Sequence, residues 1–139
     1  MSAPSDRPSV DSLPPEALQL ATKLFDLARA GSTPELIQYV SHGIPPNLTN
    51  QAGDTLLMLA AYHGHADTVR ELIAAGADVD AVNNKGQAPI AGAVFKMHDE
   101  VVRALWDAGA DPKAGHPNAL DCAKMFKRED LATLFSSRG

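Results

Sequence analysis

The sequence contains one cysteine, Cys122, among its 139 residues. No internal disulfide can therefore form, and we expect the chain to belong to the reducing cytoplasm. Basic residues are also outnumbered, with 12 lysines and arginines against 17 aspartates and glutamates and a formal net charge of -5. Since phosphate backbones and anionic lipid surfaces repel such a chain, we expect neither nucleic acid nor a membrane as its partner.

Long apolar runs and catalytic motifs are missing as well. The stretch from 89 to 95 is among the longest apolar runs, and it is far shorter than the roughly 20 residues that cross a bilayer. The first 16 residues contain no apolar segment typical of a secretory leader. The sequence also has no glycine-rich phosphate loop, no Gly-x-Ser-x-Gly turn and no His-Glu-x-x-His helix. We therefore expect no catalytic residue and no cofactor, and we predict that the chain is not an enzyme.

The composition changes once along the chain. Residues 1–14 are rich in proline, serine and aspartate and have almost no large apolar side chains, so burial cannot offset the entropy of ordering them. We predict a disordered tail there and a single domain over residues 15–139. The first helix is expected from about Glu16 to Gly31, because apolar residues recur in it at helical spacing and a pair of prolines suits its start.

The clearest feature of the sequence is an internal repeat with a period of 33 residues, as from Gly31 to Gly64. A period of this length is typical of stacked helical repeats. One series aligns Gly31, Ser32, Leu36, Val40, Gly43 and Asn47 with Gly64, His65, Val69, Ile73, Gly76 and Asp80. Another aligns Gly53, Ala60, His65, Val69, Leu72, Gly76, Ala77 and Asp78 with Gly86, Ala93, His98, Val102, Leu105, Gly109, Ala110 and Asp111.

Each unit of the repeat has the pattern of a helical hairpin. In the second unit we expect an apolar helix over residues 56–61, which Gly64 breaks, and a second helix with a buried stripe of Val69, Leu72 and Ile73. Gly76 supplies the left-handed residue that ends the second helix. Because one such hairpin has too much apolar surface to fold alone, neighbouring units must stack, and the end units must carry polar caps.

The segment GDTLLMLAAYHGHADTVRELIAAGADVDAVNNKGQ, residues 53–87, resembles the ankyrin repeat. The resemblance rests on the period and on Gly64-His65, Leu72-Ile73 and Gly76-Ala77-Asp78. It extends over residues 17 to about 135 and is similar to the short stand-alone ankyrin proteins of bacteria. It implies an all-α ankyrin-repeat solenoid of about four stacked helix-turn-helix units, with repeats near residues 17–47, 48–80, 81–113 and 114–137.

The sequence departs from the ankyrin pattern at two kinds of turn. The family's Thr-Pro-Leu-His motif is Thr55-Leu56-Leu57-Met58 in the second unit and Ala88-Pro89-Ile90-Ala91 in the third. We therefore expect a weakened hydrogen bond at this turn and a modest stability. In the third unit Met97 stands where Gly64 stands in the second, so that turn must use an ordinary backbone conformation or accept strain.

In a stacked array of this kind, the first helices and the loop tips line a concave face, and their spare side chains are free to contact a partner. We therefore predict that the chain is a non-catalytic interaction module that binds a cytosolic protein, and that it is a monomer. Tyr62 and Phe95 stand 33 positions apart, so either they anchor the partner or they only cover the seam between adjacent first helices. The candidate partner-binding residues are Arg29, Gln51, Asp54, Tyr62, His63, Asn84, Lys85, Gln87, Phe95 and Lys96.

Two other functions stay open at this point. A groove near Tyr62, His63, Phe95 and Lys96 would suit an enzyme or a protein that binds a small ligand. A purely structural role as a homo-oligomer is the third possibility. Affinity capture from the native cell would separate the three.

Three features have a simpler structural interpretation than a chemical one. His65 and His98 stand at the position where the family's histidine bonds backbone groups, and stacked repeats hold them too far apart to share a metal ion with His63. Cys122 lies in an apolar stretch, so we expect a buried, unreactive thiol. We interpret Lys124, Lys127 and Arg128 as a solubilising face and Asp99-Glu100 as the solvated start of a helix.

Overall fold

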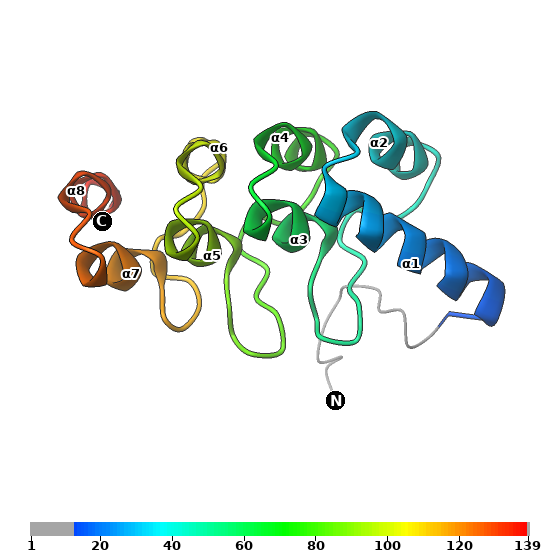
Figure 1. Cartoon of the computed structure of the whole chain (residues 1–139), viewed down its shortest axis with the longest axis horizontal. Helices are drawn as coiled ribbons and strands as arrows, with labels where there is room; N and C mark the ends of the chain where they lie inside the picture. The colour runs from blue at the N-terminus through cyan, green and yellow to red at the C-terminus, as the bar shows by residue number, and fades with distance from the viewer. Residues whose placement is uncertain (1–12, 139) are drawn as a thin grey trace.

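The computed structural model describes residues 13–138, which form eight α-helices arranged as four hairpins (Figure 1). The predicted all-α fold is confirmed. The tail expected at residues 1–14 lies outside the described residues apart from Leu13 and Pro14, and Leu13 packs against the core. The helices are α1 (Pro15–Ala30), α2 (Thr33–Ser41), α3 (Leu56–Tyr62), α4 (Ala66–Ala74), α5 (Pro89–Phe95), α6 (Asp99–Asp107), α7 (Ala119–Met125) and α8 (Glu129–Ser136).

The hairpins stand side by side and place their helices in two layers (Figure 1). The inner layer consists of α1, α3, α5 and α7, each packed on the next, and the outer layer consists of α2, α4, α6 and α8. The loops that precede α3, α5 and α7 project from the inner layer on the side opposite the outer helices. We call the surface made by the inner helices and these loops the inner face.

One continuous apolar core lies between the layers. Leu56 of α3, Leu72 of α4, Ile90 of α5 and Leu105 of α6 are completely buried, and each contributes roughly 1.5–3 kcal/mol of burial free energy. The core passes from hairpin to hairpin without a break, because each apolar stripe contacts its neighbours on both sides. This explains why the sequence repeats its apolar positions at a fixed period.

Side-chain hydrogen bonds join consecutive loops at equivalent positions. Asn47 Oδ1 accepts from the Asp78 N–H at 2.7 Å, and Asp80 Oδ1 accepts from the Asp111 N–H at 2.8 Å. Both bonds run from one repeat to the next over 31 residues. The loops therefore keep a constant spacing, and the side chains that they carry lie at defined positions on the inner face.

In the turn between the two helices of a hairpin, a glycine faces a histidine ring that comes from the corresponding turn of the next hairpin. Gly31 and Gly64 are left-handed, with φ of 73° and 83°. A Cβ added to Gly31 would stand 2.5 Å from the ring of His65, and one added to Gly64 would stand 2.8 Å from the ring of His98. No side chain fits at either glycine unless the ring moves.

The third of these turns is left-handed without glycine. Met97 has a φ of 63°, so of the two conformations that the sequence left open, the turn adopts the strained one. In the last hairpin, Arg128 occupies the position before α8 that His65 and His98 occupy before α4 and α6. Because no histidine ring follows in the last hairpin, Met97 keeps its side chain in the solvent, 62% exposed.

The starts of α3, α5 and α7 show where the hydrogen bond expected to be weakened is present and where it is absent. The buried hydroxyl of Thr55 accepts a hydrogen bond from the Met58 N–H at 3.1 Å, so the first turn of α3 keeps its cap. Asn118 caps α7 in the same way through the Asp121 N–H at 2.7 Å. Only Ala88, at the start of α5, lacks a capping side chain among these three helices. The expectation of a weakened bond therefore holds for the third unit and is wrong for the second.

The last outer helix is attached to its neighbour at both ends. At the start of α8, the Arg128 guanidinium reaches Asp99 at the start of α6. At the end, the Phe135 ring lies 5.5 Å from the ring of Trp106 in α6, and the Arg138 guanidinium lies over the same indole at 3.5 Å. The C-terminal hairpin is thus held by apolar packing together with ionic and cation–π contacts.

Candidate functional site

The structure places the ten residues predicted for partner binding on the inner face. Nine of them are exposed, and Asp54 is half-buried. Their role in binding stays a prediction. Five of them lie at the ends of inner helices, namely Arg29 near the end of α1, Tyr62 and His63 at the end of α3, and Phe95 and Lys96 at the end of α5. The others lie in the loops before α3 (Gln51 and Asp54) and before α5 (Asn84, Lys85 and Gln87).

The aromatic and cationic members of this set meet across the repeat boundaries. Lys96 Nζ lies 5.1 Å from the centre of the Tyr62 ring, and the His63 ring stands nearly perpendicular to the same tyrosine, with the ring centres 5.8 Å apart. Phe95 contacts Phe126 of the next repeat at 5.6 Å. Tyr62 and Phe95 nevertheless remain 39% and 55% exposed. They cover the seam with part of their surface and present the rest to the solvent.

The polar members of the set mostly hold the loops. Asn83 donates through Nδ2 to Asp54 Oδ1 at 2.9 Å and to Gln87 Oε1 at 2.7 Å. Asn84 donates to the Gln51 carbonyl at 2.9 Å. Three of the predicted binding side chains therefore contribute to the shape of the inner face. Lys85 and Lys96 form no ion pair with another described residue and are available to a partner.

A small cleft opens on the inner face between α3, α5 and α7. Its volume is about 160 Å³. An engineered apolar cavity of roughly this size holds a benzene ring. Its lining is largely apolar and consists of Met58, Tyr62, Gln87, Ala91, Gly92, Phe95, Pro117 and Cys122.

Gly92, which was not among the residues predicted from the sequence, lines this cleft. Gly92 lies in the middle of the seven-residue helix α5, where glycine costs roughly 0.5–1 kcal/mol relative to alanine. A Cβ there would meet only Tyr62 Cδ1, at the ordinary contact distance of 3.5 Å. The packing of the fold therefore does not require glycine at this position. An isolated glycine in a helical pattern is the signal that could have indicated the cleft.

One histidine in the turns between the helices has a backbone hydrogen-bond partner. The Nε2 atom of His65 is bonded to the Arg29 carbonyl at 2.7 Å, as the resemblance implied. Partial burial lowers the pKa of His63, and neighbouring positive groups, His65 first, lower it further. Within residues 13–138, no group of three or more histidine, cysteine, aspartate or glutamate side chains could hold a metal ion.

Cys122 is buried, as expected from the sequence. Burial raises the pKa of its thiol, and the charge of Asp121 raises it further. The reactive thiolate is therefore less populated at neutral pH than in an exposed cysteine.

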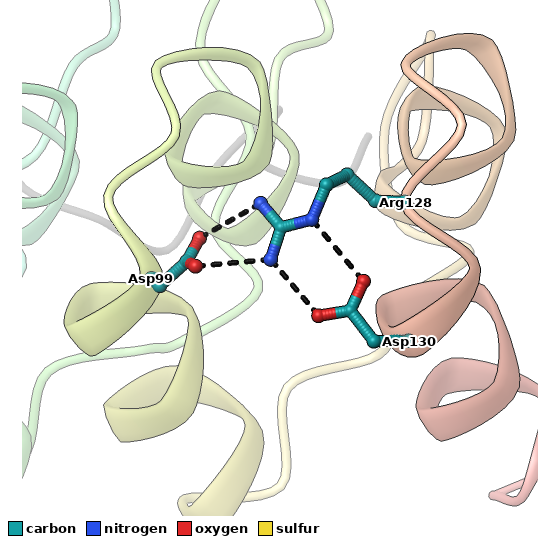
Figure 2. A network of polar contacts seen from close by, with 3 residues as sticks. All are labelled: Asp99, Arg128 and Asp130. Atoms are coloured by element: carbon teal, nitrogen blue, oxygen red, sulfur yellow. Dashed lines mark hydrogen bonds and ion pairs between the residues drawn. The ribbon is translucent and has the colours of Figure 1, made fainter.

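Arg128 has a structural role that the sequence analysis did not predict (Figure 2). Its guanidinium donates to both carboxylate oxygens of Asp99, at 3.1 and 2.9 Å, and to both of Asp130, at 3.1 and 3.0 Å. This pairing lowers the pKa of Asp130 and raises that of Arg128. Arg128 is therefore a structural ion-pair partner and not simply part of a solubilising face. Asp99 lies at the exposed start of α6, as expected, and pairs with Arg128 in addition. Lys124 and Lys127 are exposed.

Comparison with protein families matches residues 24–116 to ankyrin repeats, in three copies. The chain belongs to the ankyrin repeat family. Ankyrin repeats are generally protein–protein interaction modules, and the family is known as a non-enzymatic one. Among the described helices of this ankyrin repeat chain, none is long and apolar enough to cross a membrane.

Similar proteins come from bacteria and from humans. A putative ankyrin repeat protein of Pseudomonas aeruginosa is 54% identical over 66 residues, which cover 48% of this chain and 37% of the relative. The human ankyrin repeat domain-containing protein 29 is 42% identical over 62 residues, which cover 44% of this chain and 21% of that protein. The crystal structure of the human ASB11 ankyrin repeat domain superimposes with a TM-score of 0.61 at 26% identity, covering 64% of this chain and 40% of that one. The chain thus spans less than half the length of each of these relatives.

Proposed function

We propose that this ankyrin repeat chain is a non-catalytic module that binds a cytosolic protein through its inner face, which corresponds to the concave face expected from the sequence. The observation that carries the proposal is the exposed strip formed by Tyr62, Phe95 and Lys96 beside an apolar cleft. Aromatic side chains concentrate binding free energy in few contacts, and a rigid surface loses little entropy when a partner docks.

The cleft suits a side chain of a protein partner better than a metabolite. Pockets for small molecules usually measure about 300–1,000 Å³, whereas this cleft measures about 160 Å³. The only thiol in its lining, Cys122, has a raised pKa, so it is poorly suited to nucleophilic chemistry. These two facts favour the binding module over the enzyme or ligand-binding alternative.

The experiment compares affinity capture by the wild-type chain and by surface variants in the native cell. We expect a stoichiometric foreign protein that the variant Tyr62→Ala/Phe95→Ala no longer retains, and that the outer-face control Glu71→Ala retains in full. The melting temperature of the double variant should fall only modestly, because the two rings keep 39% and 55% of their surface in the solvent. A partner that the double variant still retains, a co-purifying metabolite or self-association alone would contradict the proposal.

A further inference from the structure

The charges of this acidic chain are unevenly distributed between its two layers. The outer helices carry mostly carboxylates, whereas the last turns of the inner helices and the turns that follow them carry cations and no carboxylate. The outer helices contain Glu35, Asp67, Glu71, Asp99, Glu100, Asp107, Glu129 and Asp130 against Arg70 and Arg103. The inner ends, residues 27–31, 62–65, 95–98 and 124–128, contain Arg29, Lys96, Lys124, Lys127 and Arg128.

Some of these cations already have a partner within the chain. Arg29 is paired with Asp26 at 2.8 Å, and Arg128 is held by two carboxylates. Lys85, Lys96, Lys124 and Lys127 form no ion pair with another described residue. The dipole of α7 accounts for a lysine in its last turn, but it does not account for Lys85, which lies in a loop.

Two of the available lysines are neighbours of residues that line the cleft, one in space and one in the sequence. Lys96 lies over the ring of Tyr62, which lines the cleft, and Lys85 stands two residues before Gln87, which also lines it. Gly92 also lines the cleft, and because it has no side chain it leaves space there. The fold does not require glycine at this position, since an added Cβ would meet only Tyr62 at an ordinary contact distance. The cleft therefore combines a largely apolar lining with a cation, Lys96, in contact with one of its lining residues.

We propose that the inner face binds an acidic segment of its partner protein, and that one phenylalanine-sized side chain of this segment enters the cleft over Gly92 while neighbouring carboxylates contact Lys85 and Lys96. This inference rests on the proposed function and adds to it the chemistry of the partner. An apolar anchor within a ring of complementary charge gives both affinity and fast, salt-dependent association.

The test starts from a random library of displayed 12-residue peptides, selected on the wild-type chain. We expect enriched peptides of net negative charge with one central aromatic or large aliphatic residue. Their affinity should fall about tenfold or more on the variant Gly92→Leu, which fills the cleft, and less on Gly92→Ala, which adds a single methyl group. Circular dichroism and melting temperature verify that both variants are folded. If Gly92→Leu does not fold, Gly92→Ala still provides the steric comparison.

The charge part of the proposal has its own matched pair. Lys96→Glu should weaken the selected peptides several-fold at low salt, while Arg103→Glu on the outer helix α6 makes the same change in net charge and should have little effect. Peptides of neutral or basic composition, or acidic peptides that bind Gly92→Leu as tightly as the wild type, would overturn the inference.

Chemical-shift mapping of the selected peptides on the chain distinguishes a failure of the inferred partner chemistry from a failure of the proposed function. If the selected peptides lack acid or ignore the cleft but still perturb Tyr62 and Phe95, the inner face binds proteins and only the inferred partner chemistry is wrong. If the peptides perturb the outer helices, or if the library yields no binder, both proposals fail.

Discussion

Replacing Met97 with glycine is expected to stabilise the chain, although it removes a large apolar side chain. Met97 is held at a φ of 63°, a left-handed conformation that costs an L-residue roughly 1–2 kcal/mol. Glycine relieves this strain but makes the unfolded chain more flexible, which offsets about 0.5–1 kcal/mol. The methionine is 62% exposed, so little burial is lost. The net gain in unfolding free energy should be about 0.5–1 kcal/mol.

The equivalent turn of the previous repeat provides the opposite control. In Gly64→Ala the new methyl group meets the same unfavourable backbone conformation, and its Cβ would also stand 2.8 Å from the His98 ring. We expect a loss of more than about 2 kcal/mol, because the ring must leave its site against the turn.

Urea unfolding followed by far-ultraviolet circular dichroism measures both variants, and calorimetry should show a rise in melting temperature of about 2–4 °C for Met97→Gly. A loss of more than about 1 kcal/mol in Met97→Gly would refute this reasoning. It would mean that contacts of the methionine side chain outweigh the strain of its backbone.

Three further predictions concern the cap, the inner turn and the thiol. Thr55→Ala should lower the unfolding free energy by about 1–2 kcal/mol, because the Met58 N–H loses its acceptor; an unchanged urea midpoint would contradict this. The folded chain lowers the pKa of His63, so this residue stabilises the fold fully above about pH 6.5 and progressively less as the pH falls below that value. The melting temperature of His63→Gln should therefore decline less between pH 7.5 and pH 5 than that of the wild type, and parallel curves would be the contrary result. Cys122 should react slowly with a thiol reagent at pH 7 and rapidly once urea unfolds the chain, and fast labelling of the folded chain would be inconsistent with its burial.

Much of the fold could be predicted from the sequence because the same constraint recurs at a fixed period. Gly31 and Gly64 mark left-handed turns, and Leu72 and Leu105 occupy the same buried position in successive outer helices. Any one position would be ambiguous, but an offset that holds over many residues fixes both the helices and their stacking.

The predictions fail or stay open where the contacts or conformation of a residue depend on a residue far away in the sequence. Arg128 was interpreted as a solvent-exposed residue because its partner Asp99 lies 29 positions earlier, outside the period of 33. The conformation of Met97 stayed open for a related reason. Its tolerance depends on the absence of a histidine ring from the next hairpin, which local sequence does not reveal.

The exposure of most candidate residues could be predicted from the sequence, but their contacts within the chain could not, and their role in binding stays a prediction. Tyr62 and Phe95 are exposed on the inner face, but Asn84 and Gln87 hold loops together. Exposed polar residues in loops look alike in a sequence whether they bind a partner or a neighbouring loop. The cleft was not predicted because it depends on the absence of a side chain at Gly92. The 33-residue periodicity indicates which side chains are buried, and it does not indicate where a cleft lies.

The contact of Trp106 with the last hairpin gives the molecule an intrinsic optical reporter. Trp106 is the one tryptophan of the sequence, and it is covered by Phe135 and Arg138 from the C-terminal end. If that end detached while the other hairpins stayed folded, the indole would meet water and its emission would shift to the red, with most of the helical signal intact. Tryptophan fluorescence therefore reports whether the C-terminal hairpin is packed on the rest of the chain. If the unfolding midpoint measured by fluorescence differs from the midpoint measured by circular dichroism, the repeats unfold in more than one step.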